Sequence, residues 1–336
     1  MYIITGGAGF IGSALLWELN KAGVCDILIV DNLESDEKWK NLVKGRYLAY
    51  MRQDVFLRHI LEDSLDEYAA LELSPAPAGK PRGIVHLGAC SSTTESDADY
   101  LMQNNLEYSK ILCSYAVRRG IRYIQASSAA TYGDGTQGFD DDPELLQKLR
   151  PLNMYAYSKH LFDLWALRTG RLNSFAGVKF FNVYGPNEYH KGDMRSMAYK
   201  AVEQIKHTGR VRLFKSCKAG YGDGGQLRDF IHVKDCVKIL HILLQRPDIN
   251  GIFNLGSGVA RSWNDLAGAV FAAMNLRPDI EYIDMPDSLA GKYQYFTQAG
   301  MRRLQSALGA SCAFAELEEG VADYVQNYLL QEDKYL

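Results

Sequence analysis

The chain alternates short apolar runs with longer amphipathic stretches. The strand-like apolar runs lie at residues 2–5, 27–31, 83–87, 122–126 and 178–182. Helix-like stretches lie between them, at residues 11–22, 101–119 and 154–171. Strands that alternate with helices are typical of a parallel sheet covered by helices on both faces. The pattern therefore predicts an α/β fold built on a doubly wound parallel sheet.

The strict alternation fades after Tyr184. Residues 230–233 and 252–255 form short strand-like runs that could rejoin the main sheet. We expect a large domain made of residues 1–181 plus about 230–258, and a smaller, discontinuous α/β lobe made of 182–229 plus about 259–336. Glycine- and proline-rich stretches predict loops at 74–81, 133–138 and 220–225, the last a mobile surface insertion.

Composition excludes several classes of protein. The 336 residues carry a formal net charge of −3, which does not suit nucleic-acid binding. The six cysteines are scattered without a C-x-x-C pair, so we expect reduced thiols and neither a disulfide framework nor a metal site. Apolar runs stay shorter than the roughly 18 residues of a membrane span. The first strand begins at residue 2, with no room for a signal peptide before it, and we expect a cytoplasmic protein.

A glycine-rich turn follows the first predicted strand. Gly7, Gly9 and Gly12 have the G-x-G-x-x-G spacing, and Phe10 and Ile11 begin the next helix. In this position the glycines allow a tight turn and close approach of a pyrophosphate, which then lies at the helix N-terminus. An ordinary glycine turn is the simpler interpretation. The strand before the turn, the helix after it and Asp31 about 20 residues on favour a dinucleotide-binding Rossmann domain.

Asp31 leaves the choice of dinucleotide open. A carboxylate at the end of the second strand accepts a hydrogen bond from the ribose 2′-hydroxyl of NAD and repels the 2′-phosphate of NADP. Asn32 and Lys38 lie just beyond it, and Lys38 with Arg52 could supply positive charge for NADP. Both cations could equally be solvated surface residues.

Tyr155 and Lys159 lie four residues apart on a predicted helix. This spacing places both side chains on one face. A free tyrosine has a pKa near 10, and a neighbouring ammonium group favours the phenolate. Ser128, at the end of the preceding strand, could hydrogen-bond a substrate oxygen. The Y-x-x-x-K spacing also occurs by chance, but after a dinucleotide turn it predicts proton transfer to and from a hydroxyl group.

Several strings of residues carry a family resemblance from residue 1 to about 330. They are the glycine turn, the Tyr155/Lys159 pair with Ser128, and the runs 88–95, 126–133, 181–186, 190–192, 253–256 and 293–299. The glycine turn, the Tyr155/Lys159 pair and Ser128 resemble those of the extended short-chain dehydrogenase/reductases. Together with the longer runs, they are similar to one family within that group, the ADP-L-glycero-D-manno-heptose 6-epimerases.

The resemblance implies a function and a cofactor. Such enzymes invert C6 of the heptose in ADP-D-glycero-β-D-manno-heptose through a transient 6-keto sugar, for lipopolysaccharide core synthesis. They keep NADP(H) tightly bound and form homo-oligomers, commonly pentamers. Inversion needs proton transfer on two sides of C6, which the resemblance gives to Tyr155 and Lys191. A phosphate-binding or surface cation is the alternative for Lys191.

The resemblance also implies binding residues. The cofactor would be lined by Leu87, Gly88, Ala89, Cys90, Ser91, Asn104 and Lys159 of the large domain, with Val183 nearby. The ADP-sugar would be held on the smaller, substrate-binding lobe by Asn182, Asp193, Lys200, Phe214, Arg228 and Tyr293. Arg228 suits a diphosphate because a guanidinium binds phosphate oxygens in pairs, although a salt bridge with its neighbour Asp229 is as plausible.

The chain departs from the family pattern at four places. Asp193 stands where a small hydroxyl residue is usual, Lys200 where a histidine often lies, and Gln53 where some members have a lysine near the cofactor phosphate. Residues 290–292 replace a basic-Gly-Arg run. These departures weaken the NADP assignment and the details of substrate contact.

Three other functions compete with this one. A UDP-sugar 4-epimerase would share the turn and the Tyr/Lys pair but has no need of a lysine placed like Lys191. A 4,6-dehydratase would have an Asp-Glu pair after Thr131, where this chain has Tyr132 and Gly133. A non-catalytic dinucleotide sensor would tend to lose Tyr155, which is present here.

Overall fold

A seven-stranded sheet forms the centre of the computed structural model, which describes residues 1–336 apart from 35–36, 74–79, 94 and 287–292. Its order is β10-β6-β5-β4-β1-β2-β3, and every neighbouring pair is parallel. The strands are β1 (Tyr2–Thr5), β2 (Ile27–Asp31), β3 (Ala49–Arg52), β4 (Gly83–His86), β5 (Arg122–Ser128), β6 (Ala176–Phe180) and β10 (Gly251–Leu255). Every residue of β1, β2 and β4 is buried, as apolar runs covered on both faces require.

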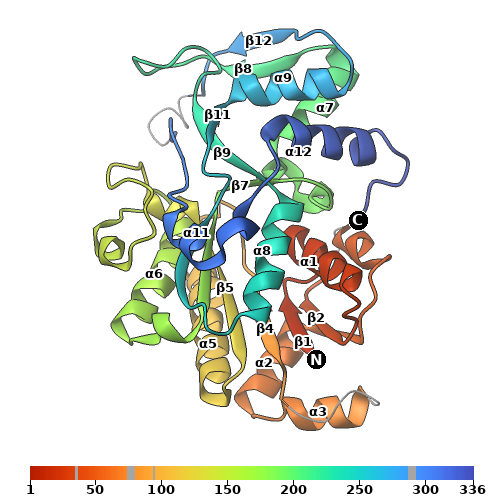
Figure 1. The fold of residues 1–336 in the computed structure, drawn as a ribbon, viewed down its shortest axis with the longest axis vertical. Coiled ribbons are helices and arrows are strands. Elements are labelled where there is room, and N and C mark those ends of the chain that lie inside the picture. Colours follow the sequence, from red (N-terminus) through yellow and green to blue (C-terminus); the bar gives the residue numbers. More distant parts are fainter. Residues whose placement is uncertain (35–36, 74–79, 94, 287–292) are drawn as a thin grey trace.

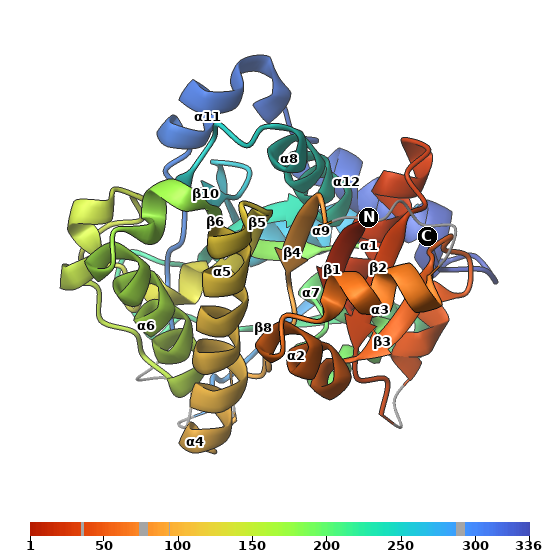
Figure 2. The same ribbon diagram turned by 90° about the horizontal axis from the view of Figure 1, so that it is seen from below.

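Helices cover both faces of this sheet, which confirms the predicted doubly wound fold (Figure 2). One face carries α1 (Phe10–Lys21), α8 (Val233–Gln245) and α11 (Arg302–Leu308), and the other carries α2 (Gln53–Leu61), α5 (Tyr108–Arg119) and α6 (Met154–Arg168). Shorter helices are α3 (Leu65–Glu72) and α4 (Ala98–Leu101), and a π-helical segment, Met102–Glu107, joins α4 to α5. Strand order reverses between β1 and β4, and open α/β sheets bind ligands at such a reversal.

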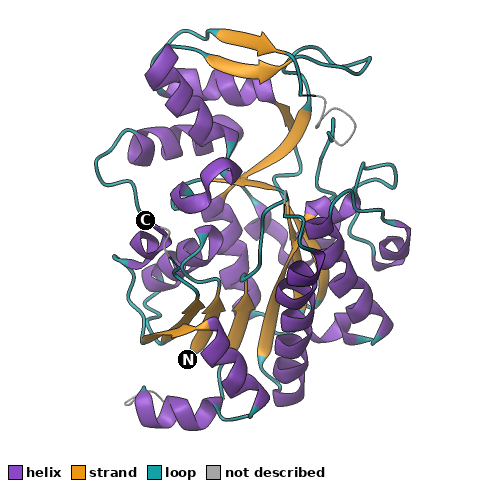
Figure 3. Cartoon of the chain, turned by 180° about the vertical axis from the view of Figure 1, so that it is seen from behind, coloured by secondary structure: helices purple, strands orange, loops and turns teal. Residues whose placement is uncertain are grey.

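Two small sheets lie beyond the carboxyl ends of the large one (Figures 1 and 3). One contains β7 (Asn182–Tyr184), β9 (Leu227–His232) and β11 (Ala260–Ser262), and the other contains β8 (Val211–Phe214) and β12 (Ile280–Ile283). They pack with α7 (Met197–Thr208), α9 (Trp263–Ala273) and α12 (Leu317–Tyr324). Further helical turns among the described residues are Glu37–Leu42, Ala129–Tyr132, Pro143–Lys148, Arg171–Ser174, Tyr189–Met194, Gly309–Cys312 and Val325–Leu329.

Two sequence predictions about strands are wrong. The strand predicted at 230–233 does not rejoin the main sheet, because as part of β9 it pairs with β7 on one side and β11 on the other in a separate small sheet. The strand predicted at 178–182 ends at Phe180. The Phe181 N–H still donates to the Leu255 carbonyl oxygen of β10. The next residues form the separate strand β7, which pairs with β9 in a small sheet. The run at 252–255 does join the main sheet, as β10.

Buried apolar side chains gather in two clusters. The larger surrounds the main sheet and includes Met301 and Leu304 near α11. The smaller joins α7, β8, α9 and α12. The domain limits given by the sequence stay a prediction. Loops are present at 133–138 and 220–225, whereas most of the loop predicted at 74–81 and the departure at 290–292 lie outside the described residues.

In the part of the chain that the structure describes, no helix is both long and apolar enough to cross a membrane. All six cysteines carry free thiols.

Candidate active site

The glycine turn joins β1 to α1. A Cβ at Gly12 would overlap the carbonyl oxygen of Gly6, so only glycine lets α1 pack this closely on the turn. A Cβ at Gly9 would meet only that same oxygen, at 3.2 Å, and its other side is open. Gly9 also caps α1 without any side-chain hydrogen bond. The first N–H groups of α1 are therefore available to an anion such as a pyrophosphate.

A cavity of about 1380 Å³ opens above this turn and extends toward the two small sheets. It is lined by most residues that the sequence proposed as a site, namely Gly9, Phe10, Ile11, Gly12, Asp31, Asn32, Lys38, Leu87, Gly88, Ala89, Cys90, Ser91, Asn104, Ser128, Tyr155, Lys159, Asn182, Val183, Lys191, Lys200, Phe214 and Tyr293. Gly7, Asp193 and Arg228 are not among the lining residues. Gly7 faces Ile29 of β2, and Gly6, with φ of +67°, lines the cavity in its place.

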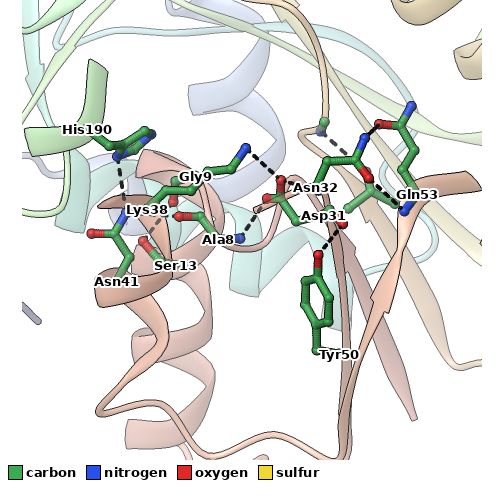
Figure 4. Close-up of polar contacts among 12 residues, drawn as sticks. Ala8, Gly9, Ser13, Asp31, Asn32, Lys38, Asn41, Tyr50, Gln53 and His190 are labelled. Atoms are coloured by element: carbon green, nitrogen blue, oxygen red, sulfur yellow. Dashed lines mark hydrogen bonds and ion pairs between the residues drawn. The ribbon is translucent and has the colours of Figure 1, made fainter. Parts of the chain in front are cut away.

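The Asp31 carboxylate holds the glycine turn in place (Figure 4). One oxygen accepts the Ala8 N–H at 2.9 Å, and the other accepts the Asn32 N–H at 2.8 Å. The Lys38 ammonium lies 3.1 Å from the second oxygen, and both side chains are largely buried. The carboxylate that the sequence proposed as a ribose ligand is thus also a structural partner of the turn, and Lys38 compensates its charge.

Three amide side chains lie next to this ion pair. The Asn32 amide donates to Gln53 Oε1 at 3.3 Å, and the Gln53 backbone N–H donates to Asn32 Oδ1 at 3.2 Å (Figure 4). The Gln53 amide donates to Asn104 Oδ1 at 3.1 Å. All three residues line the cavity. This end of the cavity therefore presents neutral hydrogen-bonding groups beside a compensated charge pair.

Tyr155 and Lys159 enter the cavity from the first turns of α6. The helix begins here because the Asn153 side chain accepts the Ala156 N–H at 2.8 Å. The Lys159 ammonium donates to the Ala126 carbonyl oxygen at 3.1 Å. Burial lowers the pKa of Lys159 to about 8, and the negative charge of Asp163 opposes that shift.

The surroundings of Tyr155 differ from the sequence expectation. Burial raises the pKa of the Tyr155 phenol, while a hydrogen bond with Ser128 acts in the opposite direction. The sequence expectation was that the neighbouring ammonium group, together with the positive nicotinamide ring of a bound cofactor, lowers this pKa. In the folded chain burial of the phenol has a larger effect on its pKa than the hydrogen bond with Ser128. Ser128 ends β5, and its hydroxyl also accepts the Ala130 N–H at 3.1 Å.

Lys191 reaches the same cavity from a different element, the helical turn Tyr189–Met194. Its ammonium lies 5.3 Å from the centre of the Phe10 ring, at the start of α1. Burial lowers the pKa of Lys191, and the Glu188 carboxylate opposes the shift. Glu188 is fully buried and accepts hydrogen bonds from the Ser196 N–H and hydroxyl at 2.5 and 2.6 Å, which closes the loop that carries Lys191.

Arg228 lies behind the wall of the cavity. Its guanidinium lies 5.6 Å from the Trp263 ring centre and 5.0 Å from that of Tyr293, and both rings line the cavity. The Trp263 indole N–H donates to the Tyr293 hydroxyl at 2.8 Å. Asp229 does not pair with Arg228, since its carboxylate accepts from Ser257, Gly258 and Ala299. Trp263 was missed by the sequence analysis because no motif marks it.

The two departures near Lys191 contact each other. The Lys200 ammonium donates to the Asp193 carbonyl oxygen at 2.6 Å, whereas the Asp193 side chain is exposed. Among the described residues, no cluster of three or more His, Cys, Asp or Glu side chains could hold a metal ion.

Comparison with known proteins gives consistent results along the whole chain. Over 336 residues, 100% of both chains, it is 56% identical to a Nitratidesulfovibrio vulgaris protein named ADP-L-glycero-D-manno-heptose-6-epimerase. A Fusobacterium nucleatum protein of the same name is 47% identical over 100% of both chains.

Solved structures agree on the fold. An ADP-L-glycero-D-manno-heptose-6-epimerase structure from Helicobacter pylori is similar, with a TM-score of 0.75, 25% identity and coverage of 97% of this chain and 95% of that one. A Thermus thermophilus UDP-glucose 4-epimerase in complex with NAD has the same fold, with a TM-score of 0.71, 22% identity and 97% of each chain covered. The model of the NAD dependent epimerase/dehydratase family matches residues 2–256. With the glycine turn and the Tyr155/Lys159 pair in one cavity, these matches show that the chain belongs to the NAD-dependent epimerase/dehydratase family.

Proposed function

We propose that the chain is an isomerase that inverts C6 of the heptose in ADP-D-glycero-β-D-manno-heptose, through a transient 6-keto sugar, for lipopolysaccharide core synthesis. The observation that carries the proposal is that Tyr155 and Lys191 line one cavity from two unrelated elements, α6 and the turn Tyr189–Met194. Full-length relatives at 56% and 47% identity carry the name of that activity.

The described residues fit a bound dinucleotide. The open side of Gly9, the uncapped start of α1 and the backbone of residues 87–91 would hold the pyrophosphate and nicotinamide half. Lys159 would hold the nicotinamide ribose. When bound, such a cofactor supplies a hydride acceptor and donor at C6.

We propose NADP as the cofactor, with NAD as the alternative. The Lys38 ammonium lies 3.1 Å from the Asp31 carboxylate and compensates its charge. This carboxylate would therefore repel a 2′-phosphate less than a carboxylate without a neighbouring cation would. The amide of Gln53 could donate to the same phosphate. Gln53 stands where some members of the family have a lysine, and this neutral residue favours NAD, which Asp31 could bind through the ribose hydroxyls. Affinity measurements with both dinucleotides decide between them.

The chain's own groups would move two protons. Tyr155 would take the proton of the C6 hydroxyl in one epimer, with Ser128 bonded to the same oxygen and Lys159 supporting the phenolate. Lys191 would give or take the proton when the arm at C6 presents its other face. A lysine can act in this way because burial lowers its pKa.

The far end of the cavity would hold the ADP group. Phe214 and Tyr293 meet edge to face with ring centres 6.3 Å apart, and Asn182 and Lys200 line the approach. Arg228 remains a proposed diphosphate ligand by family resemblance, reached between the Trp263 and Tyr293 rings. Asp193 is proposed to contact the sugar only through its loop, since its side chain does not line the cavity.

The direct test is proton NMR of ADP-D-glycero-β-D-manno-heptose incubated with the purified protein, read at C6. We expect conversion to the L-glycero epimer, and no conversion of UDP-glucose to UDP-galactose in a parallel sample. Turnover of the UDP-sugar alone would make the chain a 4-epimerase. Bound nicotinamide without turnover of either sugar would favour a dinucleotide sensor. Light scattering on the same sample tests the proposed homo-oligomer, a pentamer by resemblance.

A further inference from the structure

A buried ion pair lies directly behind the Tyr155/Lys159 helix. Lys179 of β6 places its ammonium 2.5 Å from the carboxylate of Asp163 on α6. Lys179 is fully buried and Asp163 is 2% exposed. Neither residue lines the cavity, so neither meets substrate or cofactor. A charge pair this far from water is costly to bury, which raises the question of what it does here.

The pair is bonded to the end of β5 that carries Ser128. The Ser127 hydroxyl donates to the Asp163 carboxylate at 2.9 Å. On the other side, the Lys179 ammonium donates to the Thr131 hydroxyl oxygen at 2.7 Å. That hydroxyl in turn donates to the Ser128 carbonyl oxygen at 2.8 Å. One ion pair therefore fixes two successive residues at the strand end, from two directions.

The same pair adjoins Lys159. Asp163 lies one helical turn after Lys159 on α6, and Lys159 itself bonds the Ala126 carbonyl of β5. The helix and the strand end are thus joined at Ala126 through Lys159 and at Ser127 through Asp163. These contacts fix the distance between Tyr155 on the helix and Ser128 on the strand.

The charge of Asp163 also affects the protonation of Lys159. Asp163 raises the pKa of Lys159 against the effect of burial. Cys90 acts in the same direction, His86 of β4 is held neutral, and Tyr155, one turn earlier on α6, has its pKa raised by burial. Asp163 is therefore the main negative charge that keeps Lys159 protonated.

We propose that Asp163 and Lys179 are positioning residues, which hold Tyr155, Lys159 and Ser128 in one arrangement, and that the negative charge of Asp163 also keeps Lys159 cationic. Neither touches the reacting atoms. The proposal rests on the proposed function to the extent that Tyr155 and Lys159 transfer the proton. The competing interpretation is that the pair serves folding alone.

The test removes both charges at once, because a single replacement leaves an unpaired buried charge that can prevent folding. Asp163→Asn with Lys179→Met keeps the side-chain shapes and an acceptor for Ser127. The matched control is Asp323→Asn with Lys234→Met, which removes another ion pair, of 2.7 Å, between α8 and α12.

The first readout is the pH dependence of amine labelling at Lys159, followed by peptide mapping in the full chain with its cofactor. It requires no substrate, so it is independent of the proposed function. We expect the midpoint to fall in the Asp163/Lys179 double variant, because Asp163 is the charge of the pair that raises the pKa of Lys159, and not to fall in the control. The alkaline limb of the epimerisation pH profile should move by the same amount. An unchanged midpoint would overturn the proposal, whereas wild-type protein that leaves ADP-heptose unchanged would overturn only the proposed function.

Thr131→Val provides the second variant if the double variant does not fold. It breaks the link from Lys179 to the Ser128 carbonyl and leaves every charge in place. We expect kcat to fall about tenfold with KM unchanged, because Ser128 is less well oriented. A wild-type kcat in Thr131→Val would contradict the positioning role.

Discussion

Replacing Asp31 by alanine should destabilise the glycine turn as well as change the cofactor preference. The carboxylate is 9% exposed and is the partner of the Ala8 N–H at 2.9 Å, and Ala8 is fully buried. An unpartnered buried N–H costs about 1–3 kcal/mol. Loss of the largely buried contact with Lys38 adds about 1 kcal/mol. We therefore expect Asp31→Ala to lower the free energy of unfolding by about 2–4 kcal/mol.

The assay is urea unfolding at matched cofactor occupancy, since bound cofactor itself stabilises the fold. Asp54→Ala is the control, because Asp54 also lines the cavity but is 56% exposed, so its loss should change stability by no more than about 0.5 kcal/mol. In the same samples the ratio of NADP to NAD affinity should rise about tenfold, or ~1.4 kcal/mol, because the negative charge that repels a 2′-phosphate is removed. Equal stability of the two variants would refute the structural role of the carboxylate, and an unchanged ratio would refute its role in cofactor choice.

Tyr155→Phe and Lys191→Met should each lower kcat by about 10²–10⁴-fold. Each variant should still transfer hydride to bound nicotinamide from only one of the two epimers, and a different one in each variant, which the absorbance of the reduced ring measures. If both variants lose hydride transfer from the same epimer, the two-base assignment is refuted. Gly12→Ala should weaken dinucleotide binding at least about 100-fold in a titration with the cofactor, because the added Cβ overlaps the turn. Gly268→Ala on α9 is the control, since its Cβ meets no atom within 4 Å and should leave binding unchanged. Burial lowers the pKa of His160 to about 4, below its unfolded value, so this histidine contributes stability above pH 6.5 that is lost as the pH falls toward 4, at about 1.4 kcal/mol per pH unit. His160→Gln should flatten that part of the stability profile, and an identical acid transition would contradict the shift.

The sequence predicts the centre of this fold better than its edges. Residues 2–5 and 27–31 are continuous apolar runs, because both faces of these strands are covered, and they match β1 and β2. β3 (Ala49–Arg52) was not predicted, since it is an edge strand that is only partly buried and contains no comparable run. The helix predicted at 154–171 ends at Arg168, ahead of Gly170, whose φ is +67°.

In the candidate site, too, the sequence predicts some parts and not others. Local motifs predicted the glycine turn and the Tyr155/Lys159 pair, because spacing along one turn or one helix fixes those positions. The position of Arg228 behind Trp263 could not be predicted, since it depends on three chain segments packing together. The Asp163–Lys179 pair likewise depends on how α6 lies against β6.

The central claim is that the hydrogen removed from C6 returns to the same carbon from the other side, without leaving the cavity. The measurement is NMR of ADP-D-glycero-β-D-manno-heptose, labelled with deuterium at C6 and converted by the purified protein in ordinary water. We expect an L-glycero product that keeps the whole label, and no uptake of deuterium when unlabelled sugar is converted in D₂O. Solvent hydrogen at C6 of the product would contradict it.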